Sequence, residues 1–389
     1  MESFNGRSFD VTVLKEQRRK KIVFILSAAA GILTCAAIFY LGFHWFINRQ
    51  YSSYKVEYSV YVKNGGSMDY IDYQDGIIRY GRDGVTAVDQ KGNAIWSGSY
   101  EMANPKADTC ESSAVIADIG GKSLYVHKGE GTGTELTVDC PIVQACISRQ
   151  GVVAVLLEET SSNTIALYNP FDKSEKLLAE IPTNVEDGYP ISLDISPDGS
   201  SVVASYLGVM TGAVQSRAVF YNFTDVGKNA NCLVGAHNYN DTLISEVRFL
   251  DDATVCLFGE KGFYLWSNMK QPQATGKREF TEEIRSAFAS DKYIGVILKK
   301  DEEACSMKLY DTVGTEVMAA EVSNTYDYVR IRNDEILLNS HNHCTVYRTN
   351  GVKKFDAALK GKISYFFPCK KMNRYFFVQD SKIKVIKLK

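Results

Sequence analysis

The sequence lacks the short motifs that usually identify an enzyme. It has no Gly-x-Ser-x-Gly elbow, no P-loop, no His-Glu-x-x-His zinc motif and no alternating-Asp calcium loop. Histidine is scarce, with five in 389 residues, which leaves few candidates for general acid–base catalysis. The metal-like spacing His341-x-His343, followed by Cys344, falls on a predicted solvated turn without an obvious third ligand. We therefore predict no catalytic residue, no metal site and no cofactor.

Cys-x-x-Cys pairs are also absent, although the chain contains nine cysteines. Cys35 lies in a long apolar run, and the other eight follow it, an even number that permits disulfides in an exported domain. Several of the eight lie inside short apolar stretches such as Thr254–Phe258. We expect these cysteines to be small core residues, with disulfide pairing as the alternative.

Charge is missing from Ile22 to Ile47, which contains no Asp, Glu, Lys or Arg. At about 1.5 Å per residue, a helix of this length crosses a hydrocarbon core of about 30 Å. Basic residues cluster before the run, from Lys15 to Lys21, whereas only Arg49 and Lys55 follow closely after it. This bias predicts a cytoplasmic N-terminus and a large domain outside the cell membrane.

Two other interpretations of the apolar run are weaker. A cleaved signal peptide has an apolar region of roughly 7–15 residues followed by a small-residue site. Ala28–Ala30 offers small residues, but apolar sequence flanks them on both sides. A lipid-attachment site at Leu33–Cys35 is equally unfavourable, since the sequence after Cys35 stays hydrophobic. We expect a retained signal anchor.

The predicted domains are a cytoplasmic basic tail at 1–21, a transmembrane signal-anchor helix at 22–47 and an extracytoplasmic domain at 48–389. The tail has six basic and three acidic residues, a net charge of +3, which leaves −5 for the rest of the chain. The tail is too short for a core, and we expect a disordered leader. A mildly negative domain gives no electrostatic footprint for nucleic acid.

The large domain has the pattern of an all-β protein, with short apolar or alternating runs separated by Gly, Asp, Asn, Ser and Pro. One element recurs, an apolar residue followed usually by an aromatic one and a turn. Its equivalent positions are Val88, Tyr125, Tyr168, Tyr221, Trp266, Tyr310, Tyr347 and Ile386, at steps of 37 to 53 residues. A period in this range, built from four short strands, is typical of a β-propeller blade.

Within each unit the second strand is expected to be a nearly continuous apolar run, such as 152–157 or 294–298. In the third unit we place the four strands at 142–148, 151–157, 164–168 and 175–180. The last unit ends on its third strand, whereas 54–62 forms a strand with no place in the first unit. Pairing 54–62 with 383–388 would complete an eighth blade and close the ring. We predict eight blades, with seven as the alternative.

The segment Asp194-Ile195-Ser196-Pro197-Asp198-Gly199 resembles the Ser-Pro-Asp-Gly turn of WD40-like propellers, and Leu309–Thr315 is similar to pyrroloquinoline-quinone-type repeats. The layout of basic tail, single span and divergent ring resembles an uncharacterised Gram-positive family of membrane-anchored propellers. That resemblance implies the fold and the anchoring. It does not imply quinone chemistry, because the chain has only three tryptophans.

Binding is expected on loops, where propellers usually meet their partners. The glycine-flanked insertion Leu207–Ala213 and the connections Thr183–Tyr189 and His237–Asp241 are predicted to be long loops. The candidate partner-binding residues on them are Val209, Met210, Tyr189 and Tyr239. We expect a non-enzymatic interaction scaffold of the bacterial cell envelope, whose partners are envelope or membrane proteins or a cell-wall polymer. The alternative is a propeller enzyme or ligand-binding sensor with its site in the central channel.

Overall fold

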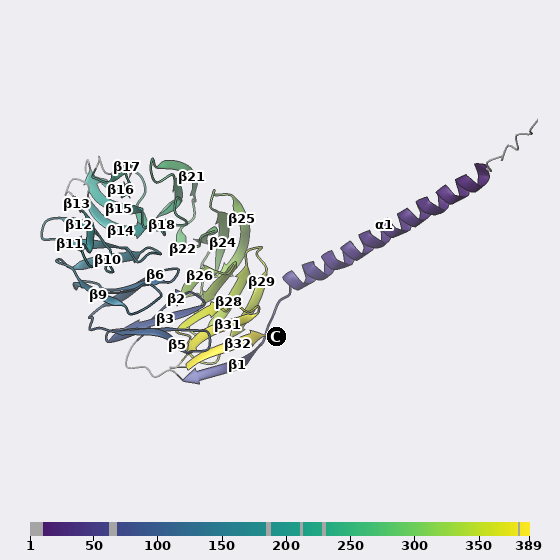
Figure 1. Cartoon of the computed structure of the whole chain (residues 1–389), viewed down its shortest axis with the longest axis horizontal. Coiled ribbons are helices and arrows are strands. Elements are labelled where there is room, and N and C mark those ends of the chain that lie inside the picture. The colour runs from purple at the N-terminus through teal and green to yellow at the C-terminus, as the bar shows by residue number, and fades with distance from the viewer. Residues whose placement is uncertain (1–10, 62–67, 184–187, 211–212, 228–230, 380–381) are drawn as a thin grey trace, which may run out of the picture. The chain divides into compact units, whose positions relative to one another are not determined.

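The computed structural model describes residues 11–61, 68–183, 188–210, 213–227, 231–379 and 382–389. These residues form one long helix and a set of short strands (Figure 1). The chain divides between Gln50 and Tyr51 into two compact units, which are described separately.

The first unit is the helix α1 (Val11–Ile47). Its part from Arg18 to Ile47 is long and apolar enough to cross a membrane, a criterion that a signal sequence also meets. The helix begins before the expected position 22, so the prediction of a disordered leader is wrong from Val11 onward, and residues 1–10 lie outside the described residues. Lys, Arg, Glu and Gln are good helix formers, and Glu16 pairs with Lys20 one turn later at 3.6 Å.

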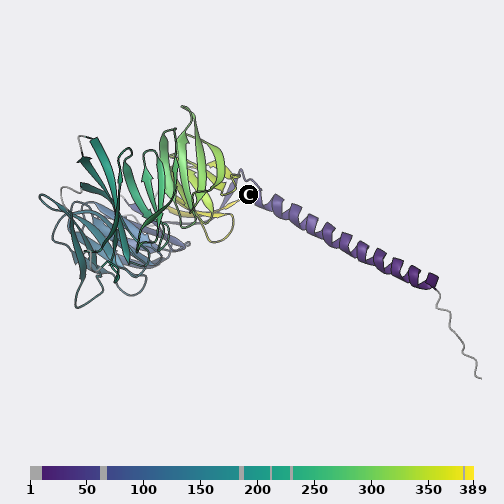
Figure 2. The same cartoon turned by 90° about the horizontal axis from the view of Figure 1, so that it is seen from above.

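The second unit is a ring of eight four-stranded antiparallel sheets, as predicted (Figure 1, Figure 2). The strands of the first four blades are β2 (Asp69–Tyr73), β3 (Gly76–Gly81), β4 (Gly84–Val88), β5 (Ala94–Ser99); β6 (Pro105–Cys110), β7 (Ser113–Asp118), β8 (Ser123–His127), β9 (Thr134–Thr137); β10 (Ile142–Ile147), β11 (Val153–Glu158), β12 (Asn163–Tyr168), β13 (Leu177–Thr183); and β14 (Tyr189–Ile195), β15 (Ser201–Met210), β16 (Ala213–Asn222), β17 (Leu233–Tyr239). Blades 5 to 7 are β18 (Ile244–Phe249), β19 (Val255–Gly259), β20 (Gly262–Ser267), β21 (Gln273–Glu279); β22 (Ile284–Ala289), β23 (Tyr293–Lys299), β24 (Ala304–Asp311), β25 (Glu316–Ser323); and β26 (Tyr328–Arg332), β27 (Glu335–Asn339), β28 (His343–Arg348), β29 (Lys353–Ala358).

The eighth blade is built from both ends of the ring-forming chain. It contains β30 (Tyr365–Pro368), β31 (Arg374–Gln379) and β32 (Lys382–Leu388), and its outer strand is β1 (Tyr54–Tyr61). β1 runs antiparallel to β32, with Tyr54 opposite Leu388 and Tyr61 opposite Lys382. The predicted closure is therefore confirmed, and it pairs the ends of the ring where open sheet edges would otherwise remain.

The two ends of the ring carry different turns. Because each blade is an antiparallel meander, the turns between its first and second strands and between its third and fourth strands lie at one end. In blade 8 this is the end at which the chain enters β1. We call it the junction end. The distal end carries the turns between second and third strands and the connections between blades.

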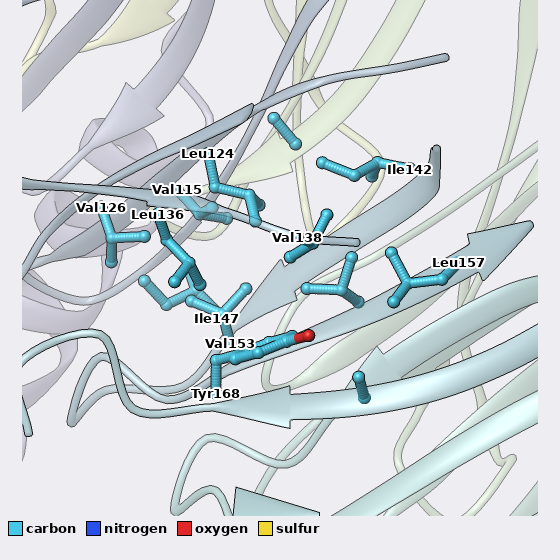
Figure 3. Packing of buried hydrophobic residues seen from close by; sticks show 13 residues of the cluster. Val115, Leu124, Val126, Leu136, Val138, Ile142, Ile147, Val153, Leu157 and Tyr168 are labelled. Carbon is cyan, nitrogen blue, oxygen red and sulfur yellow. The ribbon is translucent and has the colours of Figure 1, made fainter. Parts of the chain in front are cut away.

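Neighbouring blades pack through their second and third strands. Val115 and Val126 of blade 2 and Val153 and Tyr168 of blade 3 belong to one buried cluster (Figure 3). β11 is buried along all but its last residue. Each Val or Leu side chain buried in this way stabilises the folded state by about 1.5–3 kcal/mol. This arrangement explains the apolar second-strand runs. The aromatic repeat lies on the third strands, as expected.

Two predicted loops of blade 4 are strands instead. Residues 207–210 belong to β15 and Ala213 begins β16, so the insertion extends a hairpin in which Leu207 is opposite Ser216. Residues 237–239 end β17, so the loop predicted at 237–241 was wrong over those positions. The prediction that cysteines serve as core residues holds for the buried Cys146, Cys256, Cys305, Cys344 and Cys369; all nine thiols are free.

Candidate functional site

The innermost strands enclose a central cavity of about 860 Å³. Its lining includes residues of β2, β6, β10, β14, β18, β26 and β30. Polar residues of these first strands, among them Asp72, Asp108 and Asp194, line the cavity together with apolar ones. Its volume lies within the range of about 300–1,000 Å³ that is common for ligand pockets in proteins, so the cavity is a candidate binding site.

Polar side chains of the cavity wall join one blade to the next. Asp108 of β6 accepts a 2.9 Å hydrogen bond from the amide of Ile147 in β10. Gln144 of β10 both donates to the carbonyl and accepts from the amide of Leu193 in β14, at 2.7 and 3.0 Å. These contacts satisfy backbone groups that would otherwise be buried without partners.

The same arrangement continues from blade 4 to blade 5. Ser192 Oγ accepts from the amide of Val247 at 3.1 Å, and Asp194 Oδ2 accepts from the amide of Phe249 at 2.7 Å. Blades 2 to 5 are therefore linked by side chains that bond to the neighbouring inner strand. These four polar side chains already have structural partners.

Two carboxyl groups of the cavity have perturbed acidities. Removal from bulk water raises the pKa of Asp108. The same effect, followed by repulsion from Asp108, raises the pKa of Asp194 to about 7, against the opposing charge of Arg248. Paired carboxyls with raised pKa values are a feature of some acid–base sites, but also of buried structural groups.

Neighbouring thiols are not activated as nucleophiles. Burial raises the pKa of Cys110 to about 12 and raises that of Cys146 as well, with Asp108 and Asp194 adding to both shifts. A reactive cysteine needs a lowered pKa, because the thiolate is the attacking species. The geometry here is typical of inert core cysteines.

Blades 7, 8 and 1 meet at a second polar cluster. Asp72 of β2 accepts a hydrogen bond from the hydroxyl of Tyr365 and forms an ion pair with Arg332 at 2.7 Å. The guanidinium of Arg330 stacks over the Tyr365 ring, 4.1 Å from its centroid. These contacts cross the closing blade of the ring, so they hold the ring together at its closure.

The His341–Cys344 segment is only partly the turn that the sequence predicts, because His341 precedes β28 whereas His343 and Cys344 are its first two residues. His343 Nε2 lies 2.5 Å from Asp356, His341 is exposed and Cys344 is buried. Within the described ranges, no group of three or more His, Cys, Asp or Glu side chains is placed to hold a metal ion.

All four predicted partner residues belong to the distal end of blade 4. Tyr189 begins β14 and is 46% exposed, whereas Tyr239 is 7% exposed and accepts a 2.9 Å hydrogen bond from the Trp266 indole. Tyr239 is thus a core residue with a structural partner. Val209 and Met210 lie on β15, but their side chains fall outside the described residues. Val214, opposite Val209 on β16, is 63% exposed.

Sequence reasoning missed the polar wall of the cavity. A signal was present, since Asp108, Gln144 and Asp194 interrupt the first strands of consecutive units. Their partners lie 39 to 55 residues away and belong to the next blade, so their role becomes visible only once the ring is assembled.

The chain matches one sequence family and is similar to solved structures of other proteins. The sequence matches, over residues 47–388, the family described as "Family of unknown function (DUF5711)". No curated protein matches the chain. The structure is similar to the crystal structure of BamB from Moraxella catarrhalis, with 13% identity and a TM-score of 0.52, covering 86% of this chain and 100% of that one. It is also similar to the Neurospora crassa Pan2 WD40 domain, with 10% identity and a TM-score of 0.43, covering 73% of this chain and 87% of that one. Such low identities concern the fold alone.

Proposed function

The chain belongs to the DUF5711 family, and on that premise we propose that it is a membrane-anchored, extracytoplasmic β-propeller that acts as a non-enzymatic interaction scaffold. We place it in a bacterial cell envelope, because the sequence resembles a Gram-positive family of membrane-anchored propellers. Its partners are other envelope or membrane proteins, with a cell-wall polymer as the alternative ligand.

The anchoring rests on α1. Its apolar part, Arg18–Ile47, fits a membrane span, and the basic residues at its N-terminal side favour a cytoplasmic tail. A protein held in the plane of a membrane meets other membrane proteins at high effective concentration, so modest affinities suffice for a scaffold.

The observation that carries the scaffold is the lengthened hairpin of blade 4. β15 and β16 are each ten residues long, whereas the corresponding strands of blade 5 have five and six. The hairpin bears the exposed Val214 and lies at the distal end beside the exposed Tyr189. Exposed apolar side chains that gather on one element are typical of a protein-binding surface.

A small-molecule site in the central cavity is the second candidate. The volume of the cavity favours it, and the raised pKa of Asp194 provides a group able to exchange a proton near neutral pH. The hydrogen bonds that Asp108, Gln144 and Asp194 already make across blades favour the scaffold instead.

Crosslinking in native membranes, followed by mass spectrometry, tests the scaffold. We expect crosslinks from blade 4 to an envelope or membrane protein. Crosslinks confined to the chain itself, together with a small molecule that co-purifies and contacts Asp194, would favour the cavity.

The topology has its own test. Glu130 lies in an exposed loop, and a Glu130→Cys variant offers a site for a membrane-impermeant maleimide in intact cells. We expect labelling of the variant above the wild-type background before lysis. Labelling only after lysis would contradict the extracytoplasmic location.

A further inference from the structure

Charge is distributed very unevenly along the chain. Residues 351–389 contain eleven Lys and Arg residues but only two acidic residues, whereas 22–350 contain 27 basic and 41 acidic residues. The basic segment forms β29, the outer strand of blade 7, and three of the four strands of blade 8. Blade 8 is therefore a positively charged blade in a ring that is negative elsewhere.

Five exposed lysines of blade 8 gather at the junction end. Two lie in the turn between β30 and β31, two at the end of β32 and one at the start of β1. We call Lys370, Lys371, Lys387, Lys389 and Lys55 the junction lysines. Met372, which is 63% exposed, lies in the same turn and adds an apolar side chain to the basic surface.

Most of this charge is not neutralised. Lys370 forms an ion pair with Asp75 at 3.3 Å, whereas the other four junction lysines have no carboxylate within 4.0 Å in the part of the chain that the structure describes. Lys55 and Lys387 are directly opposed in the β1–β32 ladder, an arrangement of like charges that destabilises a sheet. Glu57 lies near them, but its main partner is Arg374, whose hydrogen bond lowers the pKa of Glu57.

The place of these lysines along the chain points to what they bind. Ile47 ends α1, and Tyr51, four residues later, is already buried in the ring. Four extended residues span at most about 14 Å, and β1 starts only three residues after Tyr51. If α1 spans the bilayer, the junction end of blade 8 is tethered to the membrane surface. Lysines within about one Debye length, about 8–10 Å, are attracted to anionic headgroups.

We infer that the junction lysines and Met372 form an anionic-lipid-binding surface, which rests the junction end of blade 8 on the bilayer that holds α1. This inference rests on the proposed anchoring. The inference also sets the orientation of the ring on the membrane. With the junction end on the bilayer, the blade 4 hairpin at the distal end faces away from the membrane. An anionic cell-wall polymer offers similar charges, but the short tether favours the lipid.

Lysine footprinting on the full chain tests this surface. The chain is reconstituted into nanodiscs of phosphatidylcholine, with or without phosphatidylglycerol, and the reactivity of each lysine toward an acetylating reagent is measured by mass spectrometry. We expect phosphatidylglycerol to reduce the reactivity of the junction lysines several-fold, and high salt to restore it. Lys360, Lys362 and Lys382, exposed at the distal end of the same blade, are the internal controls and should not change.

Variants distinguish attraction of the junction lysines to anionic lipid from mere closeness of the tethered ring to the membrane. With the other four junction lysines replaced by Gln, we expect Lys55 to lose its lipid-dependent protection. The matched variant, with Lys360, Lys362 and Lys382 replaced by Gln, should keep it.

Three results would overturn the inference. Equal reactivity of the junction lysines in neutral and anionic discs, for a chain that is inserted in both, would refute the lipid surface but leave the anchoring intact. Failure of the chain to co-purify with either disc would refute the anchoring and the inference together. Protection by added poly(glycerol phosphate) on neutral discs, with none on anionic discs, would assign the surface to a polymer instead.

Discussion

The amide of Tyr51 donates a 2.9 Å hydrogen bond to the carbonyl oxygen of Lys354, so the chain is fastened to blade 7 before it enters blade 8. The Tyr51 ring is buried, and its hydroxyl accepts a 2.8 Å hydrogen bond from Asn373 of blade 8. One residue, four positions after α1 ends in the sequence, thus joins both blades at the ring closure.

Replacing Tyr51 with Ala should therefore weaken the closed ring. We expect the free energy of unfolding to fall by about 3 kcal/mol, the usual loss for a buried aromatic side chain. Tyr51→Phe removes only the hydroxyl contact and should cost about 1 kcal/mol. Denaturant unfolding of the detergent-solubilised chain, followed by tryptophan fluorescence, measures both. An Ala variant as stable as the wild type would show that β1 alone closes the ring.

A buried ion pair supports the same closure. Lys354, which is 5% exposed, donates to Glu335, which also accepts a 2.5 Å hydrogen bond from the Tyr375 hydroxyl. Burial lowers the pKa of Lys354 despite this partner. We expect Glu335→Gln to reduce the free energy of unfolding by about 3–5 kcal/mol, because it leaves a buried charge without its counterion.

The double variant Lys354→Met/Glu335→Gln removes both charges and tests the explanation. It should recover most of the stability lost in Glu335→Gln, as measured by the same denaturation experiment. A double variant that is no more stable than the single one would mean that packing around Glu335, and not the orphaned charge, determines the loss.

The ring itself was predictable from the sequence, because each blade repeats its own chemistry. The aromatic position at Tyr168, Tyr221 or Trp266 and the apolar second strand are local patterns within one unit. The closing strand followed from a missing partner, since β32 had no fourth strand beside it. Local periodicity therefore determined both the blade count and the closure.

The blade 4 hairpin and the junction lysines could not be predicted, because both depend on contacts between residues that are distant in the sequence. The sequence predicts a loop where the hairpin of blade 4 lies, because Gly208 and Gly212 flank Val209 and Met210 and glycine usually marks a turn. β15 keeps its register with β16 through Gly208, which is opposite Gln215. The junction lysines come from both ends of the ring-forming chain and become one surface only when β1 pairs with β32.

The raised pKa of Asp194 predicts a pH dependence of stability. This pKa is about 7 in the folded protein, against an ordinary value of 3.8. At a pH between 3.8 and about 7, the folded state binds this proton more tightly than the unfolded state does. The contribution of Asp194 to the free energy of unfolding is therefore fully present below pH 3.8 and is lost as the pH rises toward 7. Asp194→Asn, which stays neutral, should flatten this fall in a plot of unfolding free energy against pH.

Asp198 is a control of opposite sign in the same blade. Burial raises the pKa of Asp198, but hydrogen bonds from Ser196 and Ser200 outweigh it and leave the pKa below its usual value. Asp198→Asn should therefore remove stability that is present at neutral pH and lost in acid. An unchanged pH profile for Asp194→Asn would show that Asp194 is already ionised in the neutral range.

The hairpin of blade 4 makes the last prediction. Val214 is 63% exposed, so Val214→Asp should leave the melting temperature unchanged. The new carboxylate would lose its water in an apolar interface with a partner, which is unfavourable. We expect partner crosslinks from blade 4 to disappear in this variant. Met210→Asp, on the paired strand, should act in the same way. Val313 is 70% exposed in a turn of blade 6 at the junction end, and Val313→Asp is the matched control that should retain the crosslinks. If Val214→Asp keeps its crosslinks, partner binding lies elsewhere on the ring; if Val313→Asp loses them too, the added charge acts on the whole molecule and not on the hairpin.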